Sequence, residues 1–557
     1  MTTLLPVKQA KITRPRWLPL AAVAAFACLA AAFAGVTRST AASADPSTLR
    51  VAVAGLPDYL DPQLSYTSEG WMAMYNSYVP LLTFRHASGK AGSKVIPGLA
   101  RGLPRVTNGG RTYTLFLRHG LRYSNGKPVR ASDFEYAIER LFKVHSGGSP
   151  FYADIVGARG FQRKQRKEIS GTSADDGSGR IVIHLSRPIG TFSEALAMPF
   201  AAPVPASTPM RAQTFSPPPA TGPYAIMDVS FDGWSYVRNP AWVSGNGRLL
   251  PQLPDGHFGS IEVDVVRSAK TRLRDVLSGT LDWDLGSPPA GRLPELQRRF
   301  GGRQFRAEPM LATYYFWMNT TKPPFDDVRV RRAANYAANP AVIAKIYDGQ
   351  VVPSQQILPP DMPGYRRIEL YRHSMAKARG LIAAADPPDR EVTVWSIAET
   401  HDREAAAYYR SQLQKIGLRA HLKVLSQYDY FSAIGNRSTP NLDTGWSNWF
   451  ADYPHPDDFF RPTLLGSSIQ RTNNNNFAQI DIPAFDAKIE SLSRRQLGPA
   501  RERGYAALDR DYMKRAPWVP IGNTTSSLIV AKAIDLDKVV WNPQIGADLA
   551  SFQLRPR

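Results

Sequence analysis

The first 44 residues constrain the fold most, because they carry the pattern of an export signal. They contain no Asp or Glu and five basic residues, and an uncharged run of 20 residues extends from Trp17 to Val36. Ala42-Ser43-Ala44 supplies the small residues of a cleavage site. We expect residues 1–44 to be a signal peptide or an uncleaved membrane anchor, since 20 residues can also span a bilayer. Both alternatives place residues 45–557 outside the cytoplasm.

The single cysteine, Cys28, lies inside this apolar run. Lipidation of Cys28 stays open as an alternative, although Ala25 stands where lipoprotein signals carry a Leu-like residue. Residues 45–557 have no cysteine, which excludes disulfides and Cys-based metal sites from the folded part. The whole chain has 43% hydrophobic residues, enough for a large core, and its length suggests two or more domains. Without disulfides, the exported part must be stabilised by that core.

Short β-rich runs alternate with helical patterns along the exported part, which predicts a mixed α/β body. The expected strands are 49–54, 112–117, 180–185, 260–266, 391–395 and 420–424, and the expected helices are 131–142, 402–416, 481–497 and 499–515. Ser132, with Glu135 three residues later, predicts a capping box for the first helix. Gly417 predicts the C-terminal end of the second helix. The run Asn473–Asn476 predicts a surface turn.

The net charge of +21 has no concentrated source. Five of the positive charges belong to the export segment, which leaves +16 on residues 45–557. The densest basic stretch, 159–167, is typical of a solvated surface. Because the chain leaves the cytoplasm, we expect no nucleic-acid partner, and an anionic membrane or wall surface is the better candidate for the basic excess.

Recognisable catalytic and cofactor motifs are missing from the sequence. His455 has Asp457 and Asp458 nearby, but no second His is close enough to complete a metal site. The adjacent acids Asp326-Asp327 and Asp457-Asp458 are more typical of helix caps than of hydrolytic pairs. We therefore expect no catalytic residues, no metal ligands and no cofactor.

Two aromatic clusters are more informative. Residues 445–454 place Trp446, Trp449, Phe450 and Tyr453 around the single acid Asp452, and residues 314–319 include Trp317. Aromatic walls around one carboxylate suit an amine-bearing organic ligand, because the walls bury the apolar part and the acid pairs with the charge. A plain core strand with aromatic filling is the alternative.

A series of motifs in consistent order resembles the extracytoplasmic solute-binding proteins of ABC importers, in the family that includes dipeptide- and oligopeptide-binding proteins. The motifs are Leu60–Pro62, Pro97–Ala100, Thr112–Phe134, Thr221–Tyr224 with Arg238–Pro240, Leu277–Asp282, Asn319–Arg331 and Ala516–Pro520. Together they span nearly all of the exported part.

The resemblance implies a two-lobed periplasmic-binding-protein fold of type II with an extra subdomain, which closes on its ligand by hinge bending. Lobe I is expected at 45–84, 216–310 and 518–557, the extra subdomain at 85–215 and lobe II at 311–517. The hinges are expected near Met310–Tyr315 and Ala516–Pro520.

The resemblance also implies a non-enzymatic receptor that delivers a solute, with peptides the first choice, to an ABC permease. Trp449-Phe-Ala-Asp452-Tyr453 is similar to the stretch that supplies the carboxylate for a peptide's α-amino group, with Trp449 as a wall. Trp446, Tyr66 and Trp317 are further candidate walls. The alternatives are the binding of nickel chelates, sugars or other small solutes, an extracytoplasmic hydrolase, and a chaperone-like or sensory binding protein on the same fold.

Overall fold

A computed structural model describes residues 47–556 apart from 213–214, 287, 290 and 497. The expected export segment and Cys28 lie outside the described residues. No helix within the described part combines the length and apolar character that crossing a membrane requires.

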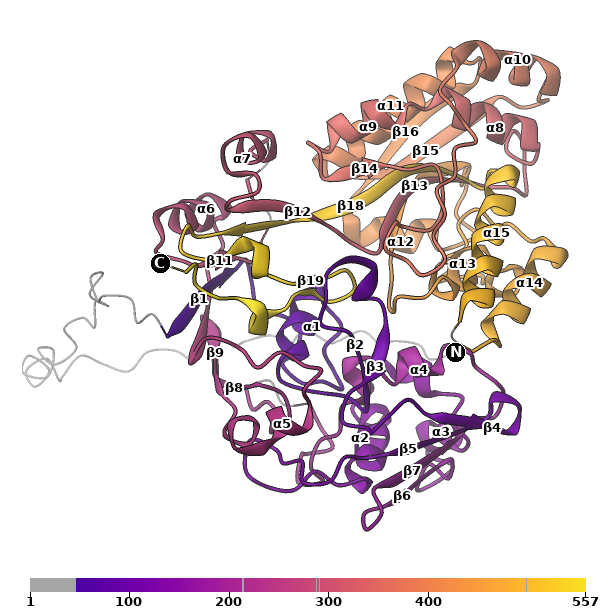
Figure 1. Ribbon diagram of the computed structural model, residues 1–557. Coiled ribbons are helices and arrows are strands. Elements are labelled where there is room, and N and C mark those ends of the chain that lie inside the picture. The colour runs from indigo at the N-terminus through magenta and orange to yellow at the C-terminus, as the bar shows by residue number, and fades with distance from the viewer. Residues whose placement is uncertain (1–46, 213–214, 287, 290, 497, 557) are drawn as a thin grey trace, which may run out of the picture. The chain divides into compact units, whose positions relative to one another are not determined.

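A twelve-stranded mixed sheet is the central element of the fold (Figure 1). Its order is β16-β15-β17-β13-β18-β11-β1-β10-β9-β8, and β12 and β14 also pair with β18. The strands are β1 (Thr48–Val53), β8 (Tyr224–Ser230), β9 (Gly233–Arg238), β10 (Ser260–Val265), β11 (Trp283–Asp284), β12 (Phe305–Pro309), β13 (Ala312–Met318), β14 (Val351–Pro353), β15 (Glu391–Ile397), β16 (Arg419–Leu425), β17 (Thr444–Phe450) and β18 (Trp518–Val530).

Three smaller sheets complete the strand structure. A four-stranded antiparallel sheet has the order β4-β5-β7-β6, and two hairpin-like pairs are β2-β3 and β19-β20. These strands are β2 (Leu82–Phe84), β3 (Val95–Pro97), β4 (Arg105–Thr107), β5 (Thr112–Phe116), β6 (Thr172–Asp175), β7 (Arg180–His184), β19 (Trp541–Asn542) and β20 (Gly546–Ala547).

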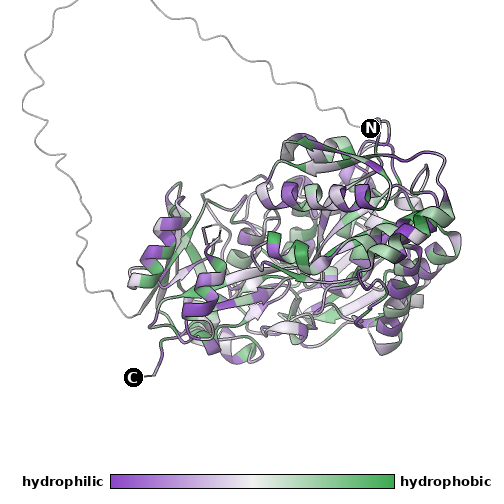
Figure 2. Ribbon diagram, turned by 90° about the horizontal axis from the view of Figure 1, so that it is seen from above, coloured by the Kyte–Doolittle hydropathy of each residue, from purple (hydrophilic) through white to green (hydrophobic). Residues whose placement is uncertain are grey.

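Helices surround these sheets, and most carry both hydrophilic and hydrophobic residues along their length (Figure 2). Such mixed composition lets one side of a helix pack on a core while the other meets water. The helices are α1 (Ser68–Tyr75), α2 (Ser132–Lys143), α3 (Ala158–Gln162), α4 (Phe192–Ala195), α5 (Gly247–Leu249), α6 (Ala269–Ser278), α7 (Leu293–Phe300), α8 (Val328–Ala337), α9 (Pro340–Ile346), α10 (Met375–Ala385), α11 (Thr400–Lys415), α12 (Gln427–Ile434), α13 (Asp457–Leu464), α14 (Pro483–Ser493) and α15 (Pro499–Arg515).

The long strand β18 joins the two halves of the large sheet. Its first half pairs with β13 and β14, and its second half pairs with β12 and β11. The run Trp518–Val530 is rich in β-branched residues, which favour such an extended strand. The short connection between β12 and β13 lies within the expected hinge Met310–Tyr315. The expected hinge Ala516–Pro520 covers only the start of β18, which changes partners between Thr524 and Thr525.

The buried hydrophobic residues separate into three main cores. The first core draws on residues 49–78, 202–283 and 528–552, and the second on 71–253 with Ile545. The third core lies within residues 311–521. This distribution parallels the expected lobe I, extra subdomain and lobe II, whose exact boundaries stay predictions.

The expected strands and the helix end at Gly417 are confirmed, and one expected helix cap is wrong. α11 ends at Lys415, and Gly417 follows with φ of 101°. At α2 the N-cap position is Ala131, which makes no side-chain cap. Ser132 instead binds Asp176 of the β6–β7 turn, with N–O and O–O distances of 2.8 and 2.9 Å. A tertiary contact thus replaces the local capping box.

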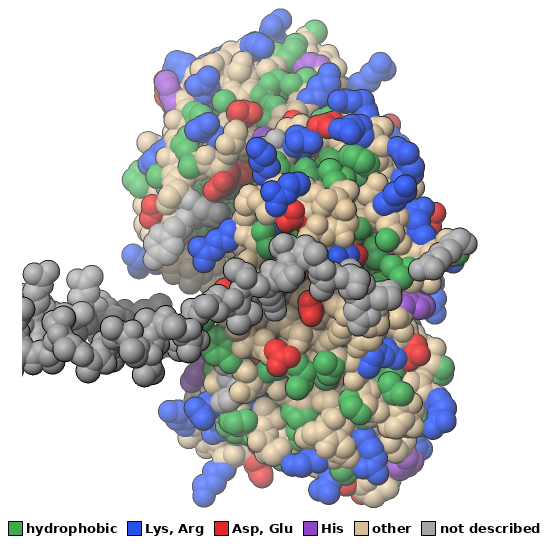
Figure 3. Space-filling view, turned by 90° about the vertical axis from the view of Figure 1, so that its left-hand side faces the viewer, with side chains coloured by type: hydrophobic (Ala, Val, Ile, Leu, Met, Phe, Trp, Pro, Cys, Tyr) green, Lys and Arg blue, Asp and Glu red, His purple; other side chains and the backbone are tan. Residues whose placement is uncertain are grey.

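Basic side chains are scattered on the face of the molecule drawn in Figure 3. Lys and Arg are interspersed there with acidic, polar and hydrophobic groups and do not form one continuous patch. This pattern agrees with the absence of a concentrated basic block in the sequence.

Candidate functional site

A cavity of about 480 Å³ lies beside Asp452. One wall comes from residues 147–195 of the second core region, and the other from residues 449–493 of the third. Tyr66 also lines it. A smaller cavity of about 110 Å³ continues past Tyr66 and Asp452, where Phe450 and Gln544 form part of the lining. The Tyr66–Asp452 pair therefore lies between two hollows.

Asp452 follows β17 in a turn that leads into α13. The Tyr66 hydroxyl donates to Asp452 Oδ1 at 2.9 Å, and the Asp452 backbone N–H donates to Asp458 Oδ2 at 2.8 Å. The Trp449 indole N–H also donates to Asp458 Oδ2, at 3.3 Å. Asp458 belongs to the first turn of α13, so its buried carboxyl group orients both the backbone at Asp452 and the ring of Trp449.

The two neighbouring carboxyl groups differ in protonation. Burial raises the pKa of Asp458 far above its usual range, and the negative charge of Asp452 raises it further. Burial also raises the pKa of Asp452, but hydrogen bonds from Tyr66 and Asp458 act in the opposite direction. Asp458 therefore holds a proton more strongly than Asp452 does, and Asp452 is the carboxyl group of the pair that ionises first.

Two other acids of the cavity already have cationic partners. Asp457 pairs with Arg461 at 3.0 Å, and Asp154 pairs with Arg187 at 2.7 Å. Within the described part of the chain, Asp452 forms no ion pair with Lys, Arg or His. The cavity therefore offers one negative charge that a ligand cation could neutralise.

Tyr66 is positioned by groups from its own loop and from the second core. Asp58 Oδ2 accepts the Tyr66 backbone N–H at 2.6 Å, and the ring of Tyr66 packs edge-on against Phe200. A Cβ on Gly147 would come within 2.7 Å of the Tyr66 ring, so only glycine allows this close approach. Burial raises the pKa of the Tyr66 hydroxyl, which therefore remains a hydrogen-bond donor.

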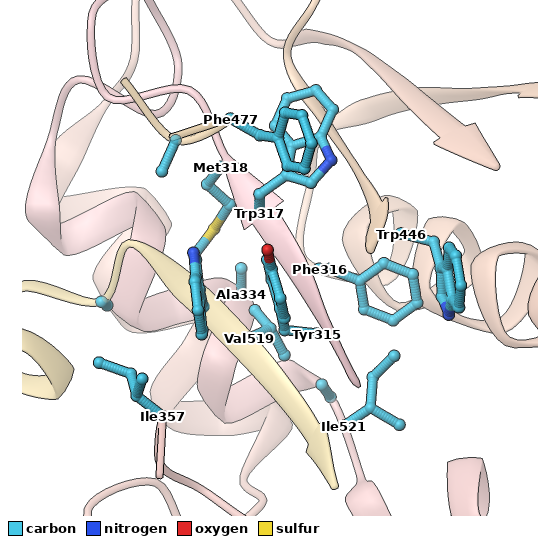
Figure 4. Packing of buried hydrophobic residues seen from close by; sticks show 14 of the residues in the cluster. Tyr315, Phe316, Trp317, Met318, Ala334, Ile357, Trp446, Phe477, Val519 and Ile521 are labelled. Carbon is cyan, nitrogen blue, oxygen red and sulfur yellow. The ribbon is translucent and has the colours of Figure 1, made fainter. Parts of the chain in front are cut away.

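Of the five candidate site residues, the structure brings together Tyr66, Trp449 and Asp452. Trp317 and Trp446 are 1% and 2% exposed and belong to the third core, as Figure 4 shows. Trp317 packs near Phe477 with ring centroids 6.2 Å apart. The Trp446 indole N–H donates to the Tyr347 hydroxyl at 2.9 Å. Neither Trp317 nor Trp446 lines the cavity beside Asp452, because β13 and β17 turn these side chains into the core.

The contacts that close one side of the cavity could not be found from the sequence. Gly190 N–H donates to Ser493 O at 2.7 Å, and Arg501 pairs with Glu194 at 3.0 Å. Arg501 also donates to Gly190 O at 3.0 Å. We call these contacts the seam, meaning the contacts of Gly190 and Glu194 with Ser493 and Arg501. Their partners lie about 300 residues apart, and no local motif marks them.

Further lining residues also escaped sequence reasoning. Asn473 and Asn475 line the cavity, whereas Asn474 and Asn476 of the same run are buried. The expected surface turn is therefore only half correct, because alternate residues of the run point to opposite sides. The sequence does not show which Asn side chains of this run are buried, because their burial depends on the core that packs against one side of the loop.

The comparisons with known proteins agree with this architecture. The family model described as "Bacterial extracellular solute-binding proteins, family 5 Middle" matches residues 94–470, more than half of the chain. The periplasmic oligopeptide-binding protein OppA of Salmonella typhimurium is 25% identical over 438 residues, which are 74% of this chain and 76% of that protein. The dipeptide-binding protein of Escherichia coli is 27% identical over 472 residues, 79% of this chain and 82% of that protein.

A solved structure extends the likeness to the whole fold. Clavulanic acid biosynthesis oligopeptide binding protein 2 superimposes with a TM-score of 0.80 at 25% identity, covering 91% of this chain and 95% of that one. The expected two-lobed α/β fold is therefore confirmed. The chain belongs to the bacterial extracellular solute-binding proteins of family 5.

Proposed function

We propose that this protein is a non-enzymatic extracytoplasmic receptor that binds peptides and delivers them to an ABC import permease. The observation that carries the proposal is the half-buried carboxylate of Asp452, which has no cationic partner among the described residues and lies at the edge of a cavity that could hold a small peptide. A free α-amino group supplies the missing positive charge and forms charge-assisted hydrogen bonds. The relatives named above, which are oligopeptide- and dipeptide-binding proteins, support the same ligand class.

In this proposal Asp452 pairs with the peptide's amino terminus. Trp449 and Tyr66 form walls beside that amino group, and the Tyr66 hydroxyl gives up or shares its bond to Asp452 when the ligand arrives. Trp317 and Trp446 are not part of the proposed contact set, because they are buried in the third core. When the peptide binds, the two expected lobes close around it. One lobe consists of residues 45–84, 216–310 and 518–557, and the other consists of residues 311–517.

Location and partners complete the proposal. Residues 1–44 direct export, and they are then removed or retained as an anchor at the membrane surface. The closed, loaded form docks on the permease, and nucleic acid has no part in this activity.

The test is calorimetric titration of the protein with tri-alanine and with N-acetyl-tri-alanine. We expect measurable binding only for the free amine, and loss of that binding in Asp452→Asn, which removes the charge at nearly constant volume. Asp232→Asn is the matched control, because Asp232 is exposed at the β8–β9 turn and does not line the cavity. Equal affinity for the acetylated peptide would refute the role of Asp452. Recovery of cleaved peptide would refute the non-enzymatic role.

A further inference from the structure

The loop that carries the Asn run has one side held in the core. Asn474 donates to Asn476 O at 2.8 Å, and its own backbone N–H donates to Gly435 O at 3.0 Å. Asn476 donates to Ile480 O at 3.0 Å and accepts the Ile480 N–H at 3.2 Å. Both side chains are at most 2% exposed. These bonds fix the loop, so the positions of the alternate residues are fixed as well.

The alternate residues present their amides to the cavity beside Asp452. Asn473 and Asn475 are exposed and line the cavity together with Gln470. In the described part of the chain, none of these three side-chain amides has a hydrogen-bonding partner. Each amide brings two N–H donors and one carbonyl acceptor. This wall can therefore both donate to and accept from a ligand.

The opposite wall has a different character. Phe151, Ile189, Phe192 and Ala195 give it an apolar surface. Apart from Asp452, the charged groups beside this wall are paired with one another, as Arg187 is with Asp154 and Arg461 with Asp457. A group that fits both walls has an apolar stem and a polar, uncharged end.

We propose that this cavity selects peptides whose first side chain has an apolar stem and an uncharged hydrogen-bonding end, with Asn473 and Asn475 as specificity-determining residues. The inference rests on the proposed function, because the amine at Asp452 places the first side chain next to this cavity. A ligand that lacks the polar end displaces water from the amides without replacing its hydrogen bonds, which lowers affinity.

Isosteric ligand pairs isolate this effect. Gln-Ala-Ala and Met-Ala-Ala have first side chains of similar length and volume, and Tyr-Ala-Ala differs from Phe-Ala-Ala by one hydroxyl. We expect the polar member of each pair to bind about tenfold more tightly, the effect of one to two net hydrogen bonds. The measurement is the dissociation constant of each peptide by calorimetry.

The variant Asn473→Gly with Asn475→Ala removes both amides. Glycine is chosen at 473 because Asn473 has φ of 54°, a region that glycine adopts freely. We expect the tenfold preference for the polar member of each pair to disappear in this variant. Asn441→Gly is the matched control, since Asn441 is exposed, has φ of 55° and does not line the cavity.

The outcomes separate this inference from the proposed function. Equal binding of Gln-Ala-Ala and Met-Ala-Ala by the wild type, or a preference that survives in the double variant, overturns the specificity role and leaves peptide binding intact. Absence of peptide binding by the wild type overturns the proposed function and this inference with it. Unchanged binding in Asp452→Asn overturns the amine-binding role of Asp452, on which the inference depends.

Discussion

Replacing Arg501 by Met will open the seam beside the cavity. The side chains of Arg501 and Glu194 are 3% and 2% exposed, and they form a 3.0 Å ion pair between α15 and α4. Burial already raises the pKa of Glu194, and Arg501 is the cation that opposes this shift. Removing one partner of a buried pair costs about 3–5 kcal/mol, because the other charge remains without compensation.

The protein can avoid most of this cost by separating the two sides of the seam, which returns Glu194 to water. A change of about 3 kcal/mol shifts an equilibrium by roughly a hundredfold. We therefore expect Arg501→Met to favour an open form. The radius of gyration of the ligand-free protein in solution scattering should rise. The affinity for peptides should fall, because binding must then also supply the free energy that closes the open form.

Two further variants test the electrostatic reason. The double variant Glu194→Leu with Arg501→Met replaces both charges by apolar groups, which is often neutral or stabilising in a buried site. It should scatter like the wild type. Lys488→Met is the control, because the Lys488–Asp511 pair is exposed and contributes less than about 1 kcal/mol. The reasoning is refuted if Arg501→Met scatters like the wild type, or if the double variant is as open as the single one.

Three more changes have defined outcomes. Arg140→Met removes the two hydrogen bonds, of 2.8 and 2.6 Å, that Arg140 donates to the buried Asp61. Urea unfolding should therefore show a loss of about 3–5 kcal/mol in the free energy of unfolding, and a loss below about 1 kcal/mol would contradict this. Gly190→Ala places a Cβ 2.1 Å from a carbonyl oxygen across the seam, so its melting temperature should fall, whereas Gly102→Ala has open space and should melt like the wild type. Burial raises the pKa of Asp509 to about 7. The unfolded chain loses this proton near pH 4 while the folded chain keeps it, so this acid makes stability fall as pH rises from about 4 to 7. Urea midpoints across that range should decline less steeply in Asp509→Asn, and an unchanged decline would exclude Asp509 as the cause.

Local sequence patterns were sufficient to predict an element when its structure depends mainly on its own residues. The alternating runs at 112–117 and 260–266 became β5 and β10, and Gly417 follows the end of α11. The WxxDY stretch placed Trp449 and Asp452 at the cavity, because β17 and the turn after it bring neighbouring residues to one edge. The same argument failed for Ser132, since Asp176, 44 residues away, binds the start of α2.

The sequence by itself determined the absence of cysteine from residues 45–557, the family resemblance and one carboxylate that lies beside the cavity. These depend on composition and on residues that are close together in the chain. Only the tertiary structure decided which aromatic residues reach the cavity, which acids have partners and which residues meet across the seam. Trp446 and Trp449 are three residues apart in one cluster, yet the first packs in the core and the second lines the cavity. The physical reason is that burial, ion pairing and protonation depend on neighbours in space, and Glu194 meets Arg501 only after more than 300 residues of chain have folded.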